Sequence, residues 1–147
     1  MHSELVGDKN VFGIEYRGEI HKNIQTIPLR LWCRGVPIGT LDEETYVPTL
    51  LHQLKRLTEF LLDPAGAIIP EPTAGRLVSL GDSFDDFVVR GFFDGQDISL
   101  TIKLGVKPFH AYPELTPGVA YKAKIPISSI KNIHSELNRR IGSVSEP

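Results

Sequence analysis

The chain has 147 residues, of which 41% are hydrophobic and 23% are charged, and its formal net charge is -2. This composition excludes a disordered chain, and it excludes a small domain that needs disulfides or a metal to compensate for a missing core. The acidic balance argues against a general nucleic-acid binder, because such proteins usually carry a basic excess.

The cysteine count and the hydropathy pattern predict the compartment. Cys33 is the single cysteine, so no intramolecular disulfide can form. The polar start "MHSELVGDKN" lacks the apolar run of a signal peptide, and no stretch approaches the roughly 18 apolar residues that span a bilayer. We therefore expect a soluble, cytoplasmic protein with no membrane association and a reduced Cys33.

The first predicted elements are strands. The segment Val11–Arg17 alternates between apolar and other residues, which is the pattern of a half-buried strand. Thr26–Arg34 alternates as well. Pro28 has no amide hydrogen to donate, so it is expected at a strand start, an edge or a bulge. The dipeptide Arg34-Gly35 predicts a turn, after which "VPIGTL" forms a short return strand.

An amphipathic helix follows. Its apolar stripe consists of Val47, Leu50, Leu51, Leu54, Leu57 and Leu61. Pro48 is tolerated only in a first turn, so the helix begins near it, and Asp63-Pro64 ends it. Carboxylates at 42–44 stand just ahead of the helix, where they complement its positive end.

The second half repeats the order of strands and then a helix. Pro64–Arg76 is a loop, and the segments "DFVVRGFF" and "DISLTIKL" form a hairpin around Asp94-Gly95. Val119–Ile127 is a further strand with Val119 on its inward face, and a helix runs from about Ser129 to Ile141. This order predicts one α+β domain over residues 1–147: a curved antiparallel sheet of about five to six strands with two helices packed on one face.

Motifs for catalysis, metal binding and phosphate binding are missing from the sequence. The five histidines lack ligand spacing, and neither a GxSxG sequence nor a glycine-rich phosphate loop occurs. Cys33 lies on the apolar face of its strand, which predicts a small buried side chain rather than a nucleophile. We expect no catalytic residues, no metal and no cofactor.

The first candidate surface is acidic. Its members are Asp82, Asp85 and Asp86, with Asp94 and Asp97 at the far end of the same hairpin. They form either a solvated loop and turn or an anionic patch that docks on a basic partner. Paired carboxylates also suit acid–base chemistry or a divalent cation, although no histidine or third ligand accompanies them.

The second candidate surface is aromatic and basic. Arg30, Trp32 and Arg34 share the strand face opposite the apolar one, and a Trp between two arginines is typical of interface hot spots. Alternatively, Trp32 packs beneath a loop with the arginine stems around it. The proline-rich loop that carries Phe109 and Tyr112 presents the same choice between recognition and core packing.

Three segments together resemble a known family. "VFGIEYRG", "LRLWCRGVPIGT" and the acidic step into "YVPTLLHQLKRL" are similar to bacterial immunity proteins encoded beside polymorphic or contact-dependent growth inhibition toxins. The closing "AYKAKIPISSIKNIHSEL" is similar to their ends. The resemblance covers roughly Val11 to Leu62 and Val119 to Ile141, and the region from Asp63 to Gly118 matches nothing in it.

The resemblance implies a non-enzymatic inhibitor that binds the C-terminal domain of its cognate toxin one-to-one, with nanomolar affinity or better. The family carries over no catalytic or binding residues. If the toxin is a nuclease with a basic cleft, the acidic surface is expected to cover it. Two alternatives stay open: a secretion chaperone or adaptor that binds an extended segment, and a small enzyme that uses the hairpin carboxylates.

Overall fold

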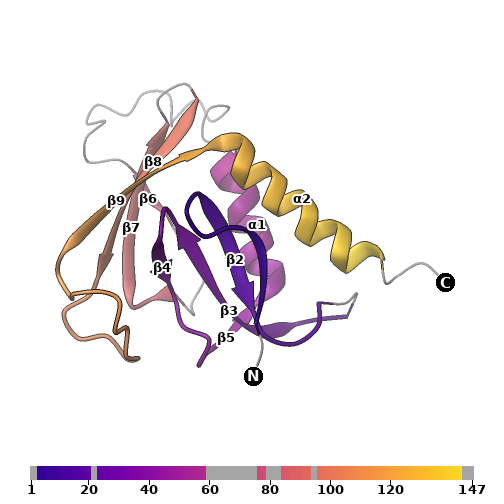
Figure 1. Ribbon diagram of the computed structural model, residues 1–147, viewed down its shortest axis with the longest axis horizontal. Coiled ribbons are helices and arrows are strands. Elements are labelled where there is room, and N and C mark those ends of the chain that lie inside the picture. Colours follow the sequence, from indigo (N-terminus) through magenta and orange to yellow (C-terminus); the bar gives the residue numbers. More distant parts are fainter. Residues whose placement is uncertain (1–2, 21–22, 59–75, 79–83, 94–95, 144–147) are drawn as a thin grey trace.

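The computed structural model describes residues 3–20, 23–58, 76–78, 84–93 and 96–143. These residues form nine strands, all paired antiparallel, and two helices. The fold class is α+β, as the sequence predicts. Figure 1 shows the two helices on one side of the molecule and the last strands on the other.

The first sheet contains five strands. They are β1 (Glu4–Asp8), β2 (Phe12–Tyr16), β3 (Thr26–Cys33), β4 (Val36–Ile38) and β5 (Glu44–Tyr46). The order is β1-β2-β3-β4, and β5 pairs with the first part of β3, whereas β4 pairs with its last part. Pro37 lies in β4 and has no amide hydrogen, which suits an edge strand and explains why this sheet ends there.

The second sheet contains four strands in the order β6-β7-β8-β9. They are β6 (Arg76–Val78), β7 (Phe87–Phe93), β8 (Asp97–Leu104) and β9 (Ala120–Pro126). Along β8, Ile98, Leu100, Ile102 and Leu104 are buried, and the residues between them are at least partly exposed. This sheet therefore has one dry face and one wet face, as the alternation predicts.

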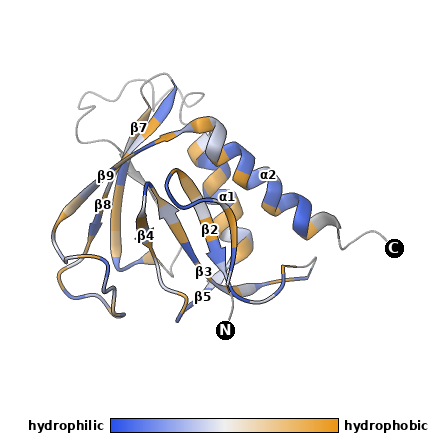
Figure 2. Cartoon of the chain, viewed as in Figure 1, coloured by the Kyte–Doolittle hydropathy of each residue, from blue (hydrophilic) through white to orange (hydrophobic). Residues whose placement is uncertain are grey.

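The helices are α1 (Val47–Thr58) and α2 (Ile127–Ser143). They pack against each other, and α2 also contacts β1, β2 and β9 (Figure 1). Both helices carry apolar and polar residues along their length (Figure 2), and the apolar residues Leu50, Leu54, Ile130 and Leu137 are fully buried. Within the described part of the chain, neither helix is long and apolar enough to span a bilayer.

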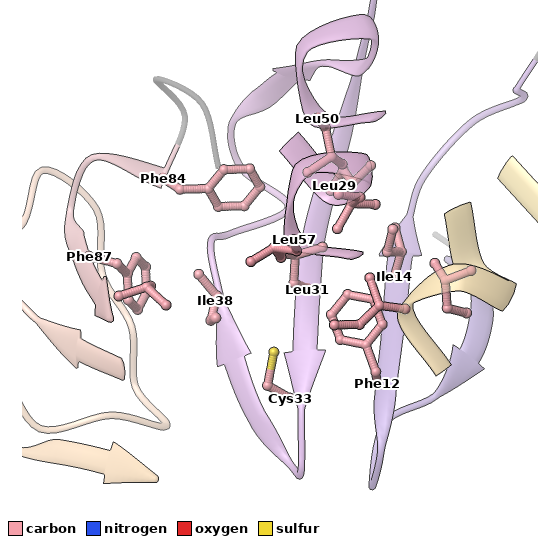
Figure 3. Packing of buried hydrophobic residues seen from close by; sticks show 14 of the residues in the cluster. Phe12, Ile14, Leu29, Leu31, Cys33, Ile38, Leu50, Leu57, Phe84 and Phe87 are labelled. Atoms are coloured by element: carbon pink, nitrogen blue, oxygen red, sulfur yellow. The ribbon is translucent and has the colours of Figure 1, made fainter. Parts of the chain in front are cut away.

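One hydrophobic cluster joins the two sheets and the helices. Ile14 and Leu31 are cross-strand neighbours on β2 and β3, and they face Leu57 of α1 (Figure 3). Ile38 of β4 lies between this group and Phe87 of β7. Because the side chains of β4 and β7 share this interior, the two sheets pack together although their strands do not pair.

The described residues form two sheets where the sequence predicted one of about five to six strands: the expected strands divide into β2–β4 and β7–β9, and three short strands add to them. β1, β5 and β6 were not expected, because three to five residues are too few to establish a period of two. The carboxylates at 42–44 precede α1, as expected, but Glu44 belongs to β5 and the first turn of α1 itself contains no acidic residue. The predicted helix end at Asp63-Pro64, the loop that follows it and the Asp94-Gly95 turn lie outside the described residues.

The predicted boundaries of the last strand also need correction. Val119 was expected on the inward face, but it is exposed and precedes β9. Its backbone N–H binds the carbonyl oxygen of Thr116 at 3.2 Å, so Val119 still belongs to the preceding turn. Glu136 does pair with Arg140 at 2.8 Å along α2, as the i, i+4 spacing predicts.

Candidate functional site

The loop between β8 and β9, residues 105–119, is closed at both ends by main-chain hydrogen bonds. Gly105 donates its N–H to the carbonyl oxygen of Asp86 at 2.8 Å, and Gly118 donates to that of Leu104 at 2.8 Å. The loop extends beyond the strands at the lower left of Figure 1. It therefore leaves the sheet and returns to it at a fixed point, next to the start of β7.

The Asp86 side chain anchors the middle of this loop. Its carboxylate accepts the backbone N–H of Phe109 at 2.8 Å and that of His110 at 3.2 Å, and it accepts the hydroxyl of Tyr112 at 2.8 Å. Partial burial alone would raise the pKa of Asp86, but these three donors and the nearby His110 outweigh burial and lower it. Asp86 thus fixes the backbone of the loop at Phe109 and His110 through hydrogen bonds.

Phe109 is the most exposed apolar side chain on the loop. It is 89% exposed, and Val106 is 76% exposed. Tyr112 differs from the expectation of a contact residue, because it is buried and packs edge-on against Phe87 with ring centroids 4.9 Å apart. Burial and the hydrogen bond to Asp86 raise the pKa of Tyr112, so its hydroxyl remains a donor.

The loop also contacts the first sheet. His110 Nε2 lies 2.7 Å from a carboxylate oxygen of Glu43, which precedes β5. Glu114 lies 3.5 Å from Arg30 on β3. Together with Asp86, these contacts attach the loop to both sheets, so its exposed tip has a stable position relative to the whole core.

Arg30 and Trp32 belong to a polar network centred on Glu15. The Glu15 carboxylate accepts hydrogen bonds from Arg30 Nε at 2.8 Å, from Trp32 Nε1 at 2.9 Å and from the Ser3 hydroxyl at 2.6 Å. Burial opposes ionisation of Glu15, but the three donors and the charge of Arg30 lower its pKa to about 2. The cations of Lys9 and Arg30 lie 4.7 and 4.8 Å from the centroid of the Trp32 ring.

This network supports the alternative in which Trp32 packs among charged side-chain stems. Trp32 and Arg30 are half-buried, and their polar atoms face Glu15 rather than solvent. Arg34 is exposed and turns away from the network, because its Nε donates to the main-chain oxygen of Lys124 on β9 at 2.7 Å. The structure therefore does not place the three residues in one shared arrangement.

The described members of the acidic surface are separated. Asp85 and Asp86 precede β7, whereas Asp97 begins β8 at the opposite end of the hairpin, about 25 Å away at the usual rise per strand residue. Asp85 is exposed, Asp86 holds the loop, and Asp97 lies 3.8 Å from Lys124. Asp82 and Asp94 lie outside the described residues. A single anionic patch does not form from Asp85, Asp86 and Asp97.

Sequence reasoning missed Glu15, although the sequence contains a signal for it. Glu15 alternates with Ile14 and Tyr16, so it lies on the same face of the sheet as Arg30 and Trp32 once β2 and β3 pair. Cys33 is buried, as predicted, and burial raises its pKa to about 12. Among the residues that the structure describes, no three His, Cys, Asp or Glu side chains gather into a group that would hold a metal ion.

Comparisons with known proteins give one structural likeness. No family model matches the chain. No curated protein matches it either. The chain is similar to a crystal structure of CdiI from Burkholderia dolosa AUO158, with a TM-score of 0.49 and 12% sequence identity, over 90% of this chain and 99% of that chain. A likeness of this degree leaves the function to be argued from the chain's own residues.

Proposed function

We propose that this chain is an immunity protein: a single cytoplasmic domain that binds the C-terminal domain of a cognate bacterial toxin and neutralises it without chemistry of its own. The observation that carries the proposal is the anchored loop tip with Phe109. An apolar ring that is 89% exposed sits on a backbone whose N–H groups are held by Asp86. Rigid, exposed aromatic residues are typical anchors of protein interfaces.

Anchoring matters because isolated exposed apolar residues are common and need no explanation. Here the loop is tied to the second sheet through Asp86 and to the first through Arg30 and Glu43. Holding a loop in one conformation before binding lowers the entropy lost on association, which favours tight complexes. An inhibitor that must outlast its target requires this kind of surface.

The class of partner follows from the resemblance in sequence. The segments that resemble immunity proteins form β2, β3, β4, α1, β9 and the start of α2, which build the core. The loop lies almost entirely in the region from Asp63 to Gly118, which this resemblance does not cover. A common scaffold with a distinctive loop is the arrangement expected of proteins that each recognise a different partner.

The proposal predicts that the gene directly upstream encodes a large secreted protein with a toxic C-terminal domain, and that domain is the partner used in the test. Purified chain and purified domain are expected to form a one-to-one complex with Kd of about 1 nM or lower by calorimetry. Co-expression of the chain is expected to restore growth of bacteria that express the domain. Absence of both binding and protection contradicts the proposal.

The alanine variant of Phe109 tests whether the exposed ring at the loop tip contacts the toxin domain. Phe109→Ala is expected to weaken binding by about 2 kcal/mol or more, which is about 30-fold in Kd, if the ring is an interface anchor. Leu5→Ala is the matched control, because Leu5 is also an exposed apolar residue but lies on β1. Equal, small effects of the two variants argue against the loop as the binding site.

A further inference from the structure

The register of β7, β8 and β9 defines which residues share the outer, wet face of the second sheet. Three cross-strand rows make up most of this face: Val88–Lys103–Ala120, Arg90–Thr101–Lys122 and Phe92–Ser99–Lys124. The residues between them, such as Ile102 and Leu100, are buried on the opposite face. The face therefore presents three strands side by side with their polar side chains toward solvent.

The charge on this face is positive. Arg90, Lys103, Lys122 and Lys124 are all exposed, and Asp97 at the start of β8 is the only carboxylate at the positions of β7–β9 that share this face. Four cations and one carboxylate give a local charge of +3 in a chain whose net charge is -2. Polar residues recur along these strands in Figure 2.

The contacts of Lys122 place its charge over the middle of the sheet. Lys122 Nζ lies 3.1 Å from the hydroxyl oxygen of Thr101, its cross-strand neighbour on β8. Arg90 is the neighbour of Thr101 on the other side. Adjacent strands are about 4.8 Å apart, so Lys122 and Arg90 flank Thr101 within about 10 Å of each other. Their fields add over this distance, which is comparable to the screening length in physiological salt.

Exposed apolar side chains border the cationic face (Arg90, Lys103, Lys122 and Lys124) at one end. Val88 and Val119 are 45% and 44% exposed, and Val119 directly precedes Ala120 of the first row. The anchored loop leaves and rejoins the sheet at this same end, through the bond of Gly118 to Leu104. The loop that carries Phe109 is therefore joined to the sheet at the Val88–Lys103–Ala120 end of the cationic face.

We propose that the cationic face and the loop tip form one contact surface for an acidic protein face; resting on the proposed function, this is an acidic surface of the toxin domain. The cations steer the acidic partner toward the sheet and speed association. Phe109 then fills an apolar pocket of the partner and slows dissociation. This assignment replaces the acidic hairpin surface and its basic target, because Asp86 is occupied by the loop and Asp97 lies on the cationic face itself.

A protein partner fits this surface better than a nucleic acid does. Phe109 is the strongly exposed ring of this surface and Phe92 is partly buried, whereas single-strand binders stack successive bases on repeated exposed aromatic residues; the other exposed apolar residues, Val88, Val106 and Val119, are aliphatic. A cationic area beside apolar anchors is instead the anatomy of a protein interface, with an apolar centre and a polar rim.

The test compares two charge-reversal pairs of the full chain by surface plasmon resonance against the toxin domain. Lys103→Glu with Lys122→Glu changes the cationic face. Arg56→Glu with Lys131→Glu changes the helices, where both residues are also exposed, and it alters the net charge by the same amount. The first pair is expected to lower the association rate about tenfold or more at about 50 mM salt, and this deficit is expected to shrink at about 500 mM. The helix pair is expected to stay within about twofold of the unmodified chain.

A neutral pair, Lys103→Gln with Lys122→Gln, covers the case in which reversal disturbs folding. It is expected to lower the association rate in the same direction by a smaller factor. If the unmodified chain binds the domain but both cationic-face pairs associate as fast as the helix pair, this inference is wrong and the proposed function stands. If the unmodified chain does not bind the domain, both are wrong. Salt-dependent binding of the unmodified chain to DNA or RNA oligonucleotides, lost in the reversal pair, would make the face a nucleic-acid site and overturn the inference.

Discussion

The carboxylate of Asp86 and the backbone N–H of Phe109 are 2.8 Å apart, although 23 positions separate them in the chain. Through this bond, the residue before β7 determines where an exposed aromatic ring stands after β8. The same carboxylate holds His110 and Tyr112, so a single side chain fixes one turn of the loop. The sequence suggests Asp86 as a member of an acidic surface patch, whereas in the structure it supports the loop that carries Phe109.

Asp86→Asn is expected to loosen this turn. The amide has one acceptor oxygen in place of two, so at least one of the three donors loses its partner, at a cost of about 1–3 kcal/mol in the free energy of unfolding. Urea unfolding measures that cost, and hydrogen exchange at the amides of Phe109 and His110 locates it. Asp85→Asn is the control: Asp85 is exposed and adjacent, and its variant is expected to change stability by less than about 0.5 kcal/mol.

The stability that Asp86 contributes has a definite pH dependence. Its pKa is lowered in the folded chain from an ordinary value of 3.8, so the ionised form is favoured by folding. The contribution is therefore complete above about pH 4 and is lost as the pH falls through the lowered pKa. The stability difference between the unmodified chain and Asp86→Asn is expected to shrink as the pH falls below the ordinary value of 3.8; a constant difference would mean that the charge plays no part.

Glu15→Gln tests the network around Trp32. Glu15 is buried and accepts hydrogen bonds from Ser3, Arg30 and Trp32, so the neutral amide is expected to cost about 2–3 kcal/mol at neutral pH. Trp32 is the single tryptophan of the chain, so its fluorescence reports the network directly. The control is Glu4→Gln on β1, which is exposed. Unchanged emission and stability in Glu15→Gln would contradict the network.

Acid is expected to remove the effect of Glu15 as well. Its pKa is about 2 in the folded chain against an ordinary value of 4.5, a difference that corresponds to roughly 3 kcal/mol. Because the pKa is lowered, this contribution is present above about pH 4.5 and disappears as the pH falls toward 2. Trp32 emission followed by pH titration of the native chain checks the window.

The sequence predicted the long strands and the helices because their patterns extend over enough residues. The alternation from Ile98 to Leu104 and the stripe from Leu50 to Leu57 reappear as buried faces. The polar contacts were not predictable in the same way, since Glu15 and Arg30 meet only when the register of β2 and β3 is known. The role of Asp86 depends on a loop that returns to the start of β7, and no local pattern encodes that return.

Gly39→Ala tests the contact between the end of β4 and the residue that leads into β7. Gly39 has a φ of +97°, and an added Cβ would lie 2.8 Å from the ring of Phe84, which is buried in the shared core. Backbone strain costs about 1–2 kcal/mol and the overlap about 1–3 kcal/mol more. Gly35→Ala is the control, because Gly35 has a φ of +82° and open space around it, so only the strain remains. Equal losses in urea unfolding would show that Phe84 moves aside freely.

The last prediction concerns Cys33, the single thiol of the chain. It is fully buried, and burial raises its pKa from 9.0 to about 12. A thiol reagent is therefore expected to leave the folded chain unlabelled and to react with one equivalent after urea unfolding. Ser128→Cys in a Cys33→Ala background supplies the exposed control, since Ser128 lies on the surface of α2 and a thiol there is expected to react at once. The raised pKa of Cys33 also makes the free energy of unfolding depend on pH, because folding favours the protonated thiol. Relative to the Cys33→Ala variant, the stability of the unmodified chain is expected to be unchanged below pH 9 and to fall above it, by about 2 kcal/mol at about pH 10.5. Rapid labelling of native Cys33 at neutral pH would contradict the packing of β3 against the core.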